Sequence, residues 1–489
     1  MNTTKKINLC LTFFIVAFAA NAQNDDFEKD FKAFTYQAEK EYTDFRDRAN
    51  KDYAEFIKKA WQQFKSSPAE PAPVKEKPAP PQPYIDDDNK KEEKEIPIIE
   101  VLPIVKPKPQ PNPIEPIKPE PCPKVEPFVF SFYGTNMQVA MDEKHLFALS
   151  GNTENDISVA WKVLSSNKYD NVIEDCLNLR AKHNLCDWAY LNMLQQLAEQ
   201  FLGKGNEAVL LTAYIYCQSG YKMRLAKNNN EDIYMLVASD HCIYGIRYFN
   251  IDGERYYALN CPDTSLYICK ASFPREQALS LFISREIKLA SNKSEVRSFR
   301  SEHFPQMGAD VCNNKNLMDF YNSYPSSEIN DNLMTRWAMY ANTPMDEDVK
   351  QMLYPALRNA IKGKTQLEAV GMLLNFVQTA FVYGYDDEVW GRDRAFFAEE
   401  SLYYPYCDCE DRSILFSRLV RDLVGLKVIL VFYPGHLATA VHFTDNVCGD
   451  YIVLNNSKFT VCDPTYIPAP VGATMPEMDN GTAKVILLD

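Results

Sequence analysis

Two regions of the chain show the same succession of apolar patterns. In the first, DWAYLNMLQQLAEQFL and EAVLLTAYIYCQSGY have helical spacing, and the strand-like runs IYMLVASDHCIYGIRYF and ERYYALNC follow. In the second, QLEAVGMLLNFVQTAFVYGY and RSILFSRLVRDLVGLKV predict helices, and VILVFYPG, HLATAVHF and YIVLNNSKFTVCD predict strands. Helices followed by strands predict an α+β fold, and the recurrence indicates one plan used twice.

These patterns divide the chain into two globular units, over residues 128–300 and 301–489. Ahead of them, residues 23–66 place Phe27, Phe31 and Phe34 at helical spacing among charges, which predicts an amphipathic helical segment that needs a partner surface. Residues 67–127 contain eighteen of the 30 prolines, interleaved with charged residues. Such a composition lacks the apolar surface that offsets ordering entropy, so we expect a disordered, extended linker.

Residues 1–22 have the features of a signal peptide. Lys5 and Lys6 precede an apolar run too short to span a bilayer, and Ala20-Asn21-Ala22 matches a small-x-small cleavage site. We therefore expect an exported protein, periplasmic or secreted, cleaved near Ala22. No later segment is long and apolar enough to predict a transmembrane span.

Composition narrows the choice of partner. The net charge of −14, or −16 without Lys5 and Lys6, argues against nucleic acid or an anionic membrane surface as the main partner. An exported chain with 13 cysteines is allowed to form disulfides, but the sequence does not specify any pairing.

The stretch YPYCDCEDRSILFSRL carries the candidate chemistry. Cys409 stands where the second helix of the later unit is predicted to begin, and backbone N–H groups at a helix start favour a thiolate. The neighbouring carboxylates oppose this by raising a thiol pKa, so the thiol needs a cation. His436, twenty-seven residues later at the start of a strand, is the candidate base, and Asp463, twenty-seven residues further, is the candidate orienting acid.

The motifs DCEDRSILFSRLVRDLVGL, PGHLATAVHF and FTVCDPTY together resemble the transglutaminase-like branch of the papain-like cysteine enzymes. The resemblance covers about residues 365–467. It implies that Cys409 is the nucleophile, His436 the base and Asp463 the orienting acid, with a thioester intermediate and no metal or organic cofactor. Family members often use an aromatic N–H or O–H in the oxyanion hole, and Trp390 is the candidate here.

The resemblance predicts a hydrolase, or less readily an acyltransferase, acting on amide bonds of a protein, a peptide or a peptidoglycan stem peptide. The N-terminal helices would then bind an envelope partner. The alternative is a non-enzymatic envelope scaffold or peptide-binding protein with an inactive transglutaminase-like fold.

Other residues near the motifs have simpler interpretations. Cys407 is the rival nucleophile, but a bystander or disulfide role suits it better, and His442 reads as a core histidine. A zinc site from Cys407, Cys409, His436 and Cys462 matches no paired C-x-x-C pattern. Aligning Gly220 with Gly425 places Lys204, His241 and Asn260 near the positions of the three candidate catalytic residues, which suggests that the first unit is a degenerate copy without a nucleophile.

Overall fold

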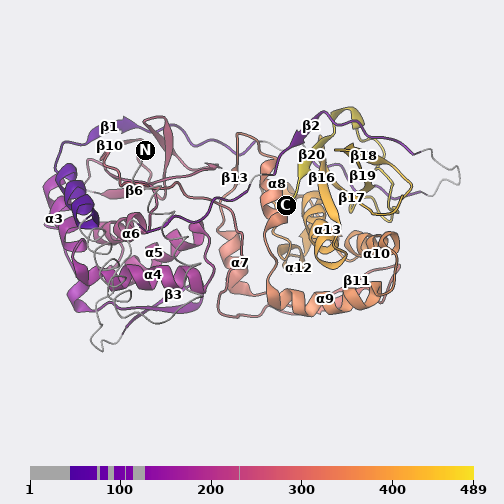
Figure 1. Ribbon diagram of the computed structural model, residues 1–489, viewed down its shortest axis with the longest axis horizontal. Helices are drawn as coiled ribbons and strands as arrows, with labels where there is room; N and C mark the ends of the chain where they lie inside the picture. Colours follow the sequence, from indigo (N-terminus) through magenta and orange to yellow (C-terminus); the bar gives the residue numbers. More distant parts are fainter. Residues whose placement is uncertain (1–44, 74–76, 86–92, 105, 114–126, 231) are drawn as a thin grey trace, which may run out of the picture.

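The structure is a computed structural model that describes all residues except 1–44, 74–76, 86–92, 105, 114–126 and 231. It has two lobes side by side, each with helices packed on a sheet (Figure 1). The α+β class expected from the sequence is confirmed. Within the described residues, no helix has the length and apolar character needed to cross a bilayer.

Within the described residues, the N-terminal lobe has a six-stranded sheet and four helices in addition to the helix of residues 45–57. The helices are α3 (Glu154–Leu164), α4 (Asp170–Lys182), α5 (Asp187–Leu202) and α6 (Asn206–Gln218). The strands, in their spatial order, are β1 (Gln62–Lys65), β10 (Ser265–Ile268), β5 (Met223–Lys227), β6 (Ile233–Ala238), β9 (Glu254–Ala258) and β8 (Tyr248–Ile251). Every neighbouring pair in this sheet is antiparallel.

The C-terminal lobe has six helices and a second six-stranded sheet. The helices are α8 (Thr335–Asn342), α9 (Glu347–Ile361), α10 (Gln366–Thr379), α11 (Asp386–Val389), α12 (Glu400–Tyr403) and α13 (Cys409–Leu423). The strands, in spatial order, are β2 (Glu100–Leu102), β20 (Lys484–Leu487), β16 (Lys427–Tyr433), β17 (His436–His442), β19 (Ser457–Cys462) and β18 (Tyr451–Leu454). Only β2 runs parallel to its neighbour.

Short elements connect and flank the lobes. They are the pairs β3 (Phe128–Phe132) with β4 (Thr135–Val139), β11 (Arg297–Arg300) with β12 (Gly308–Val311), β7 (Cys242–Ile243) with β13 (Ser327–Glu328) and β14 (Val382–Tyr383) with β15 (Tyr406–Cys407), the helix α7 (Lys315–Asn322), and the 3-10 turns η1 (Glu143–His145), η2 (Asn167–Tyr169) and η3 (Asn480–Thr482). The β11–β12 hairpin crosses the expected boundary at residue 300, and β12 packs on α9 of the C-terminal lobe. The second unit therefore starts before β11.

The two large sheets have the same strand order, although β1 runs antiparallel and β2 parallel to its neighbour. In each, the first two strands after a helix lie at the centre, the next two form one side, and the fifth lies on the other side next to a strand from the N-terminal segment. The preceding helix, α6 or α13, packs on the central strands. Each helix is followed by a glycine at positive φ, Gly220 at +93° and Gly425 at +75°, a conformation that glycine adopts without strain. The succession of patterns seen in the sequence thus corresponds to a structural repeat.

Each sheet also curls around a small core on the face away from its helices. In the C-terminal lobe this core includes Val431, Ala438 and Ile452. The same N-terminal segment that adds an edge strand reaches the opposite edge of each sheet: Ser67 bridges to Tyr248 in β8, and Glu95 to Tyr451 in β18. Each sheet is thereby closed into a small barrel, which removes its exposed edges.

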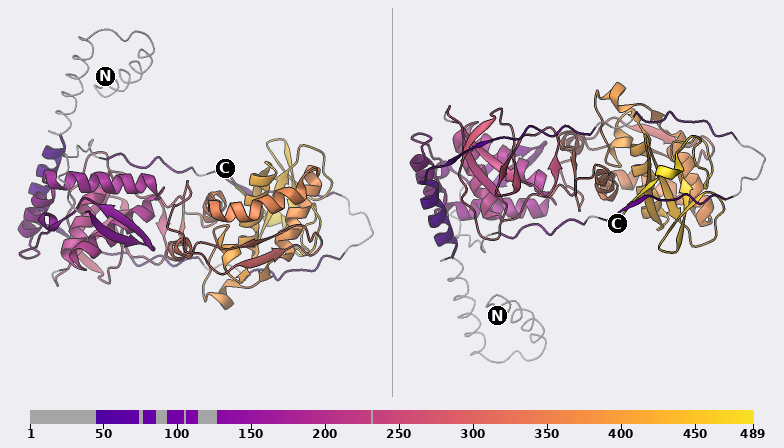
Figure 2. Two further views of the ribbon diagram at one scale, coloured as in Figure 1. Left: turned by 90° about the horizontal axis from the view of Figure 1, so that it is seen from below. Right: turned by 90° about the horizontal axis from the view of Figure 1, so that it is seen from above.

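The helical segment expected before residue 66 is docked where the structure describes it. Residues 45–57 are helical, and Tyr53, Ala54 and Ile57 are buried against the N-terminal lobe (Figure 2, indigo). A buried ion pair of 2.8 Å joins Arg46 to Asp170 of α4. Phe64, expected in a helix, lies in strand β1. The predicted signal peptide and the Phe27, Phe31, Phe34 stripe lie outside the described residues.

The expectation of a disordered linker over residues 67–127 does not hold for its described stretches. Residues 95–102 pair with the C-terminal sheet, and β2 lies beside the yellow strands of that lobe in Figure 1. Ile96 is buried in the barrel core. On the N-terminal lobe, Gln110 donates to the carbonyl of Leu185 at 2.9 Å. Prolines are tolerated here because only some of the N–H groups of an edge strand donate hydrogen bonds to the neighbouring strand.

Candidate active site

The start of helix α13 is fixed by a capping box. Asp408 is the N-cap, and its carboxylate accepts from the backbone N–H of Glu410 at 3.0 Å, while the carboxylate of Asp411 accepts from the N–H of Asp408 at 3.1 Å. This local pattern fixes the residue at which the helix begins. Cys409 is consequently the first helical residue, as the sequence predicted, and it is completely buried.

His436 and Asp463 come together at one end of the C-terminal sheet. His436 opens β17 after the tight turn at Gly435, whose φ is +72°, and Asp463 directly follows β19. Nε2 of His436 lies 2.8 Å from Oδ2 of Asp463, and Oδ1 of the same carboxylate accepts from the backbone N–H of Thr465 at 2.9 Å. The predicted pairing of these two residues is therefore present in the structure.

The hydrogen bond to Asp463 has a consequence for the other ring nitrogen. A carboxylate acceptor favours the tautomer with the proton on Nε2, which leaves Nδ1 of His436 as a proton acceptor. Nδ1 is buried and makes no hydrogen bond among the residues that the structure describes. The imidazole thus has one nitrogen anchored and one available.

The contact between α13 and β17 brings Cys409 to this end of the sheet. Ser413, one helical turn after Cys409 and on the same face, donates from Oγ to the carbonyl of Leu437 at 2.8 Å. The small residues Ala438 and Ala440 of β17 do not face the helix. Both alanines belong to the barrel core, whereas Leu437 and other residues of the opposite face pack on α13. His436 reaches the site only because it is the first residue of its strand.

The loop after Asp463 is held by two buried side chains from neighbouring helices. Nε2 of Gln378, in α10, donates to the carbonyls of Asp463 at 3.0 Å, Tyr466 at 2.8 Å and Ala469 at 3.1 Å. Arg412 of α13 donates to the carbonyl of Gln378 at 3.1 Å, and Arg412 is 1% exposed. Sequence reasoning missed both residues, because nothing local distinguishes a loop anchor from an ordinary polar residue.

Trp390, the candidate oxyanion donor, ends helix α11. Its ring centroid is 4.7 Å from that of Tyr404 and 5.8 Å from that of Phe396, and the guanidinium of Arg394 lies 4.6 Å from the indole. These contacts place the indole in an aromatic cluster around an arginine. The oxyanion role of Trp390 stays a prediction.

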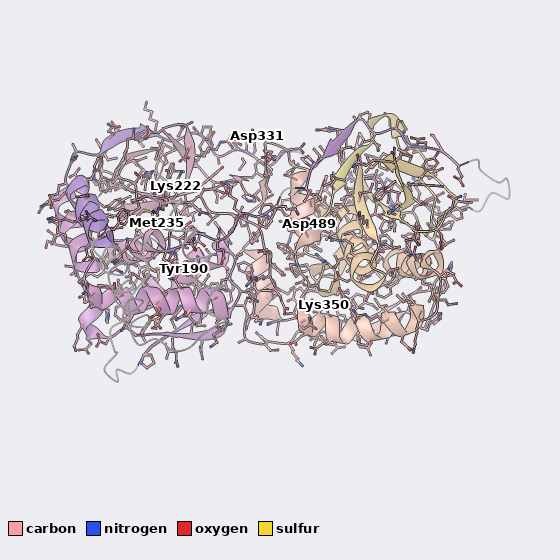
Figure 3. The ribbon with its side chains drawn as sticks, in the orientation of Figure 1. Tyr190, Lys222, Met235, Asp331, Lys350 and Asp489 are labelled. Carbon is pink, nitrogen blue, oxygen red and sulfur yellow. The ribbon has the colours of Figure 1, made fainter. Side chains whose placement is uncertain are left out.

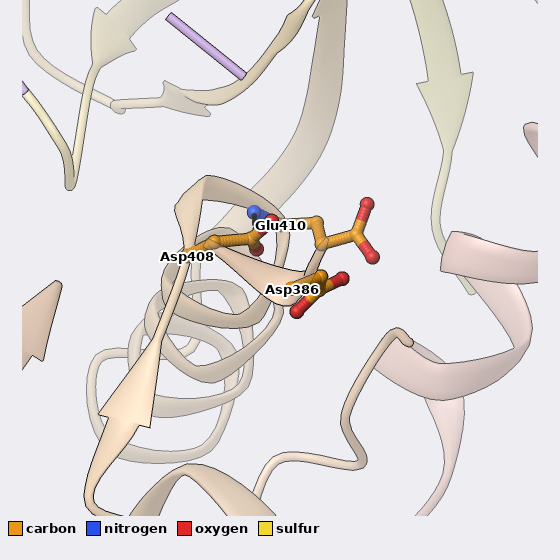
Figure 4. Close-up of side chains that lie close together, drawn as sticks. All are labelled: Asp386, Asp408 and Glu410. Carbon is orange, nitrogen blue, oxygen red and sulfur yellow. Dashed lines mark hydrogen bonds between the residues drawn. The ribbon is translucent and has the colours of Figure 1, made fainter. Parts of the chain in front are cut away.

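A group of buried carboxylates surrounds the start of α13. Asp386, Asp408 and Glu410 have carboxylate oxygens within 4.8 Å of one another (Figure 4), and among the described residues this is the one set of three potential metal ligands that converges. Glu410 accepts from the indole N–H of Trp337 at 2.7 Å and lies 3.8 Å from the guanidinium of Arg336. Protein donors therefore already compensate its charge.

Burial also changes the acidity of this region. The pKa of Asp411 is raised well above its ordinary value, first by burial and then by the nearby Asp408 and Asp386. Glu399, which precedes α12, has its pKa raised to about 7 by burial. Carboxyl groups whose pKa is raised by burial in this way are common at functional sites.

The other cysteines and the histidine considered near the motifs, Cys407, Cys462 and His442, lie at strand ends in the core or bonded to the backbone. Cys407 ends strand β15, and burial raises its pKa. His442 is the last residue of β17, and its Nδ1 lies 2.9 Å from the carbonyl of Lys458. Cys462 is buried, and burial raises its pKa as well. None of the eleven cysteines within the described residues forms a disulfide.

The strand registers identify the equivalent positions in the N-terminal lobe. Aligning the strand that follows each helix pairs Cys409 with Lys204, His436 with Asp232 and Asp463 with Asn260. The expectation that His241 stands at the histidine position is therefore wrong. His241 lies beyond β6, where Nε2 accepts from the N–H of Leu281 at 3.1 Å, and burial lowers its pKa to about 3.

An open cavity of about 400 Å³ occupies the equivalent position in the N-terminal lobe. Its lining includes Asn206, Asp232, Met235 and Asn260, and Figure 3 labels Met235 within this lobe. The side chain of Asn206 is not a nucleophile. Its oxygen accepts a hydrogen bond from the N–H of Ile233 at 2.8 Å. This lobe retains the cleft but lacks the thiol and the imidazole.

No protein-family model matches this chain, and searches of curated proteins and of solved structures found none that is significantly similar.

Proposed function

We propose that the C-terminal lobe is a cysteine-dependent enzyme that acts on amide bonds through a thioester, with Cys409 as nucleophile. The single observation that carries the proposal is the buried His436–Asp463 pair, 2.8 Å from Nε2 to Oδ2, at the end of the sheet where α13 begins. An imidazole held in this way, with Nδ1 available, is the base that a thiol at a helix start requires.

The proposed reaction has two steps. The Cys409 thiol transfers its proton to Nδ1 of His436 as sulfur attacks the carbonyl carbon of the substrate amide. The imidazolium then returns this proton to the leaving amine, the C–N bond breaks, and a thioester remains. Water, deprotonated by the same imidazole, attacks the thioester and releases the acid and the thiol. Asp463 stabilises the imidazolium throughout, because its carboxylate accepts from Nε2.

The setting of this activity is part of the same proposal. The motifs at residues 1–22 favour export, and the acidic net charge of −14 favours a protein, a peptide or a peptidoglycan stem peptide over nucleic acid as substrate. Hydrolysis is favoured over transfer because water is abundant outside the cell. We also propose that this lobe has a transglutaminase-like fold, on the basis of the three sequence motifs.

The test compares thiol reactivity among variants. We expect an acylating activity-based probe to label the full-length protein at Cys409, and we expect no labelling of Cys409→Ala. Labelling by iodoacetamide near neutral pH should be slower in His436→Ala than in the wild type, since the thiol then has no base. Equal, slow labelling of wild type and His436→Ala would contradict the proposal.

Two observations favour a second candidate, a non-enzymatic scaffold or peptide-binding protein. Cys409 is 0% and His436 2% exposed, and Nδ1, the atom that would take the thiol proton, makes no hydrogen bond among the described residues. Catalytic hydrogen bonds are often long without substrate and tighten when it binds. A protein that binds peptides equally well as wild type and Cys409→Ala, and that never reacts with the probe, would be the scaffold.

A further inference from the structure

A short stretch of the Pro-rich region lies against both sides of the His436–Asp463 pair. The stretch is KPAPPQPY, residues 77–84. The N–H of Ala79 donates at 2.9 Å to the carbonyl of Gly435, which directly precedes His436. At the other end, the N–H of Tyr84 donates at 2.7 Å to the carbonyl of Ile467, in the loop after Asp463. The segment is thus bonded through its backbone to the residues that flank the pair.

Backbone pairing continues at Ile467, whose N–H donates at 3.1 Å to the carbonyl of Gln82. Side chains add apolar contacts: Ala79 and Tyr84 pack against the buried Tyr466 and its neighbours, and the rings of Tyr84 and Tyr466 meet edge to face with centroids 5.4 Å apart. Lys77 extends the contact, with Nζ 4.8 Å from the ring of Tyr385. The segment therefore binds this surface by main-chain hydrogen bonds and aromatic packing together.

This arrangement is the one by which proteins bind extended peptides. Main-chain hydrogen bonds align the peptide, and its alternate side chains fill adjacent pockets. Four of the eight residues in the segment are prolines, which hold the chain extended and reduce the entropy lost on binding. The two N–H groups that donate hydrogen bonds to the surface belong to Ala79 and Tyr84, which are not prolines.

We propose that the surface between Gly435 and Ile467 is the binding site for an extended polypeptide substrate, and that residues 77–84 occupy it as a peptide of the same chain. This inference rests on the proposed function, and it names the substrate class as an extended peptide chain. A substrate has to displace residues 77–84 before it reaches Cys409, so the segment holds the site latent.

The first test changes one hydrogen bond. Ala79→Pro removes the N–H that donates to Gly435, whereas Ala79→Ser keeps it. We expect iodoacetamide to label Cys409 roughly fivefold faster in Ala79→Pro, because one hydrogen bond holding the segment is lost, and at the wild-type rate in Ala79→Ser. Equal labelling rates in the two folded variants would overturn the inference.

The second test replaces the segment. A Gly/Ser sequence in place of residues 78–84 should accelerate the labelling at least about tenfold, since several contacts are lost together. The matched control replaces the seven residues 107–113, of which Lys108 and Gln110 contact the N-terminal lobe, and should leave the rate unchanged. Added KPAPPQPY peptide should restore slow labelling, and the control peptide KPKPQPNP, residues 106–113, should not.

A binding measurement separates this inference from the proposed function. Fluorescent KPAPPQPY should bind the 78–84 replacement in the Cys409→Ala background, as measured by polarisation, because binding does not need the thiol. If the peptide binds but the replacement variant that retains Cys409 never reacts with the probe, the peptide site is supported and the enzymatic function is refuted. Probe reaction at Cys409 without peptide binding, and without acceleration by the replacement, would sustain the enzyme and refute the peptide site.

Discussion

The two lobes share one sheet topology but bury different kinds of side chain. In the C-terminal lobe, seven buried carboxylates lie around the start of α13 and the end of β19: Asp386, Glu399, Glu400, Asp408, Glu410, Asp411 and Asp463. In the N-terminal lobe, the residue at the start of α6 is a half-buried Asn206, and the cleft is lined by uncharged and apolar residues together with Asp232 and Glu199. The two copies of the same fold therefore differ in the number of carboxylates buried near the equivalent helix start.

This difference indicates where function is concentrated. Burying carboxylates is costly even where hydrogen bonds and ion pairs compensate them, so their concentration in one of two lobes of the same plan indicates a functional constraint on that lobe. The N-terminal lobe, where Lys204 is exposed and pairs with Glu199 at 3.9 Å, has no such constraint at the equivalent position. The comparison predicts that changes at matched positions have unequal effects.

The largest expected effect is on reactivity at the orienting acid. Asp463→Asn keeps the shape of the side chain but favours the wrong tautomer of His436, and we expect reaction of Cys409 with an activity-based probe to slow by about a thousandfold or more. The matched change Asn260→Ala in the N-terminal lobe should leave the rate unchanged. Equal rates for both variants would remove the functional distinction between the lobes.

The next effect is on stability three residues after the matched pair Cys409 and Lys204, at Arg412 and Glu207. Arg412→Met leaves buried carbonyls, including that of Phe381, without their donor, and we expect it to lower the free energy of unfolding by about 3 kcal/mol. Glu207, at the matched position in the N-terminal lobe, accepts from the N–H of Leu149 and from no other donor within the described residues. Chemical denaturation of Glu207→Gln should show a loss of about 1 kcal/mol or less.

A pH-dependent effect should appear at Glu399. Burial raises its pKa from an ordinary value of 4.5 to about 7, so its folded form keeps a proton that its unfolded form has released between these values. Its contribution to stability is therefore complete below pH 4.5 and is lost as the pH rises through 7. Glu399→Gln, which stays neutral, should stabilise the protein by about 2 kcal/mol at pH 8 and change it little at pH 4.5. Denaturation curves at the two pH values check this sign.

The smallest effect is expected at Asn206. Asn206→Ala removes the acceptor of the Ile233 N–H and should cost about 1 kcal/mol of unfolding free energy, without any change in the labelling rate of Cys409. A change in that rate would mean that the two clefts are coupled. Thermal unfolding and thiol labelling of the same preparation measure both quantities.

Local patterns predicted most of the regular structure. The run RSILFSRLVRDLVGL became α13, with Leu415 and Leu419 buried, and HLATAVHF became β17. The positions of Cys409 at a helix start, His436 at the start of a strand and Asp463 directly after the adjacent strand also followed from the sequence. These features depend on periodicity and capping within a few residues, which the chain specifies directly.

Predictions that needed the register of distant strands were less successful. The register places Asp232 at the histidine position, nine residues before His241 and at the opposite end of β6, and only the pairing of β6 with β5 fixes this. The Pro-rich region was expected to be free because its average composition hid the β-branched run at Ile96 to Val101, which completes a barrel. A search for short apolar runs within that region would have found this signal.

The sequence by itself determined the two helix-then-sheet units, the capped start of α13 and the residue types at the candidate site, since each depends on neighbours a few positions away. Only the tertiary structure decided that Nε2 of His436 meets Asp463, that Gln378 and Arg412 anchor the adjoining loop, and that residues 77–84 lie on the same surface. Such contacts join segments up to several hundred residues apart. They form because burial and hydrogen bonding in the complete fold outweigh the entropy lost in bringing those segments together.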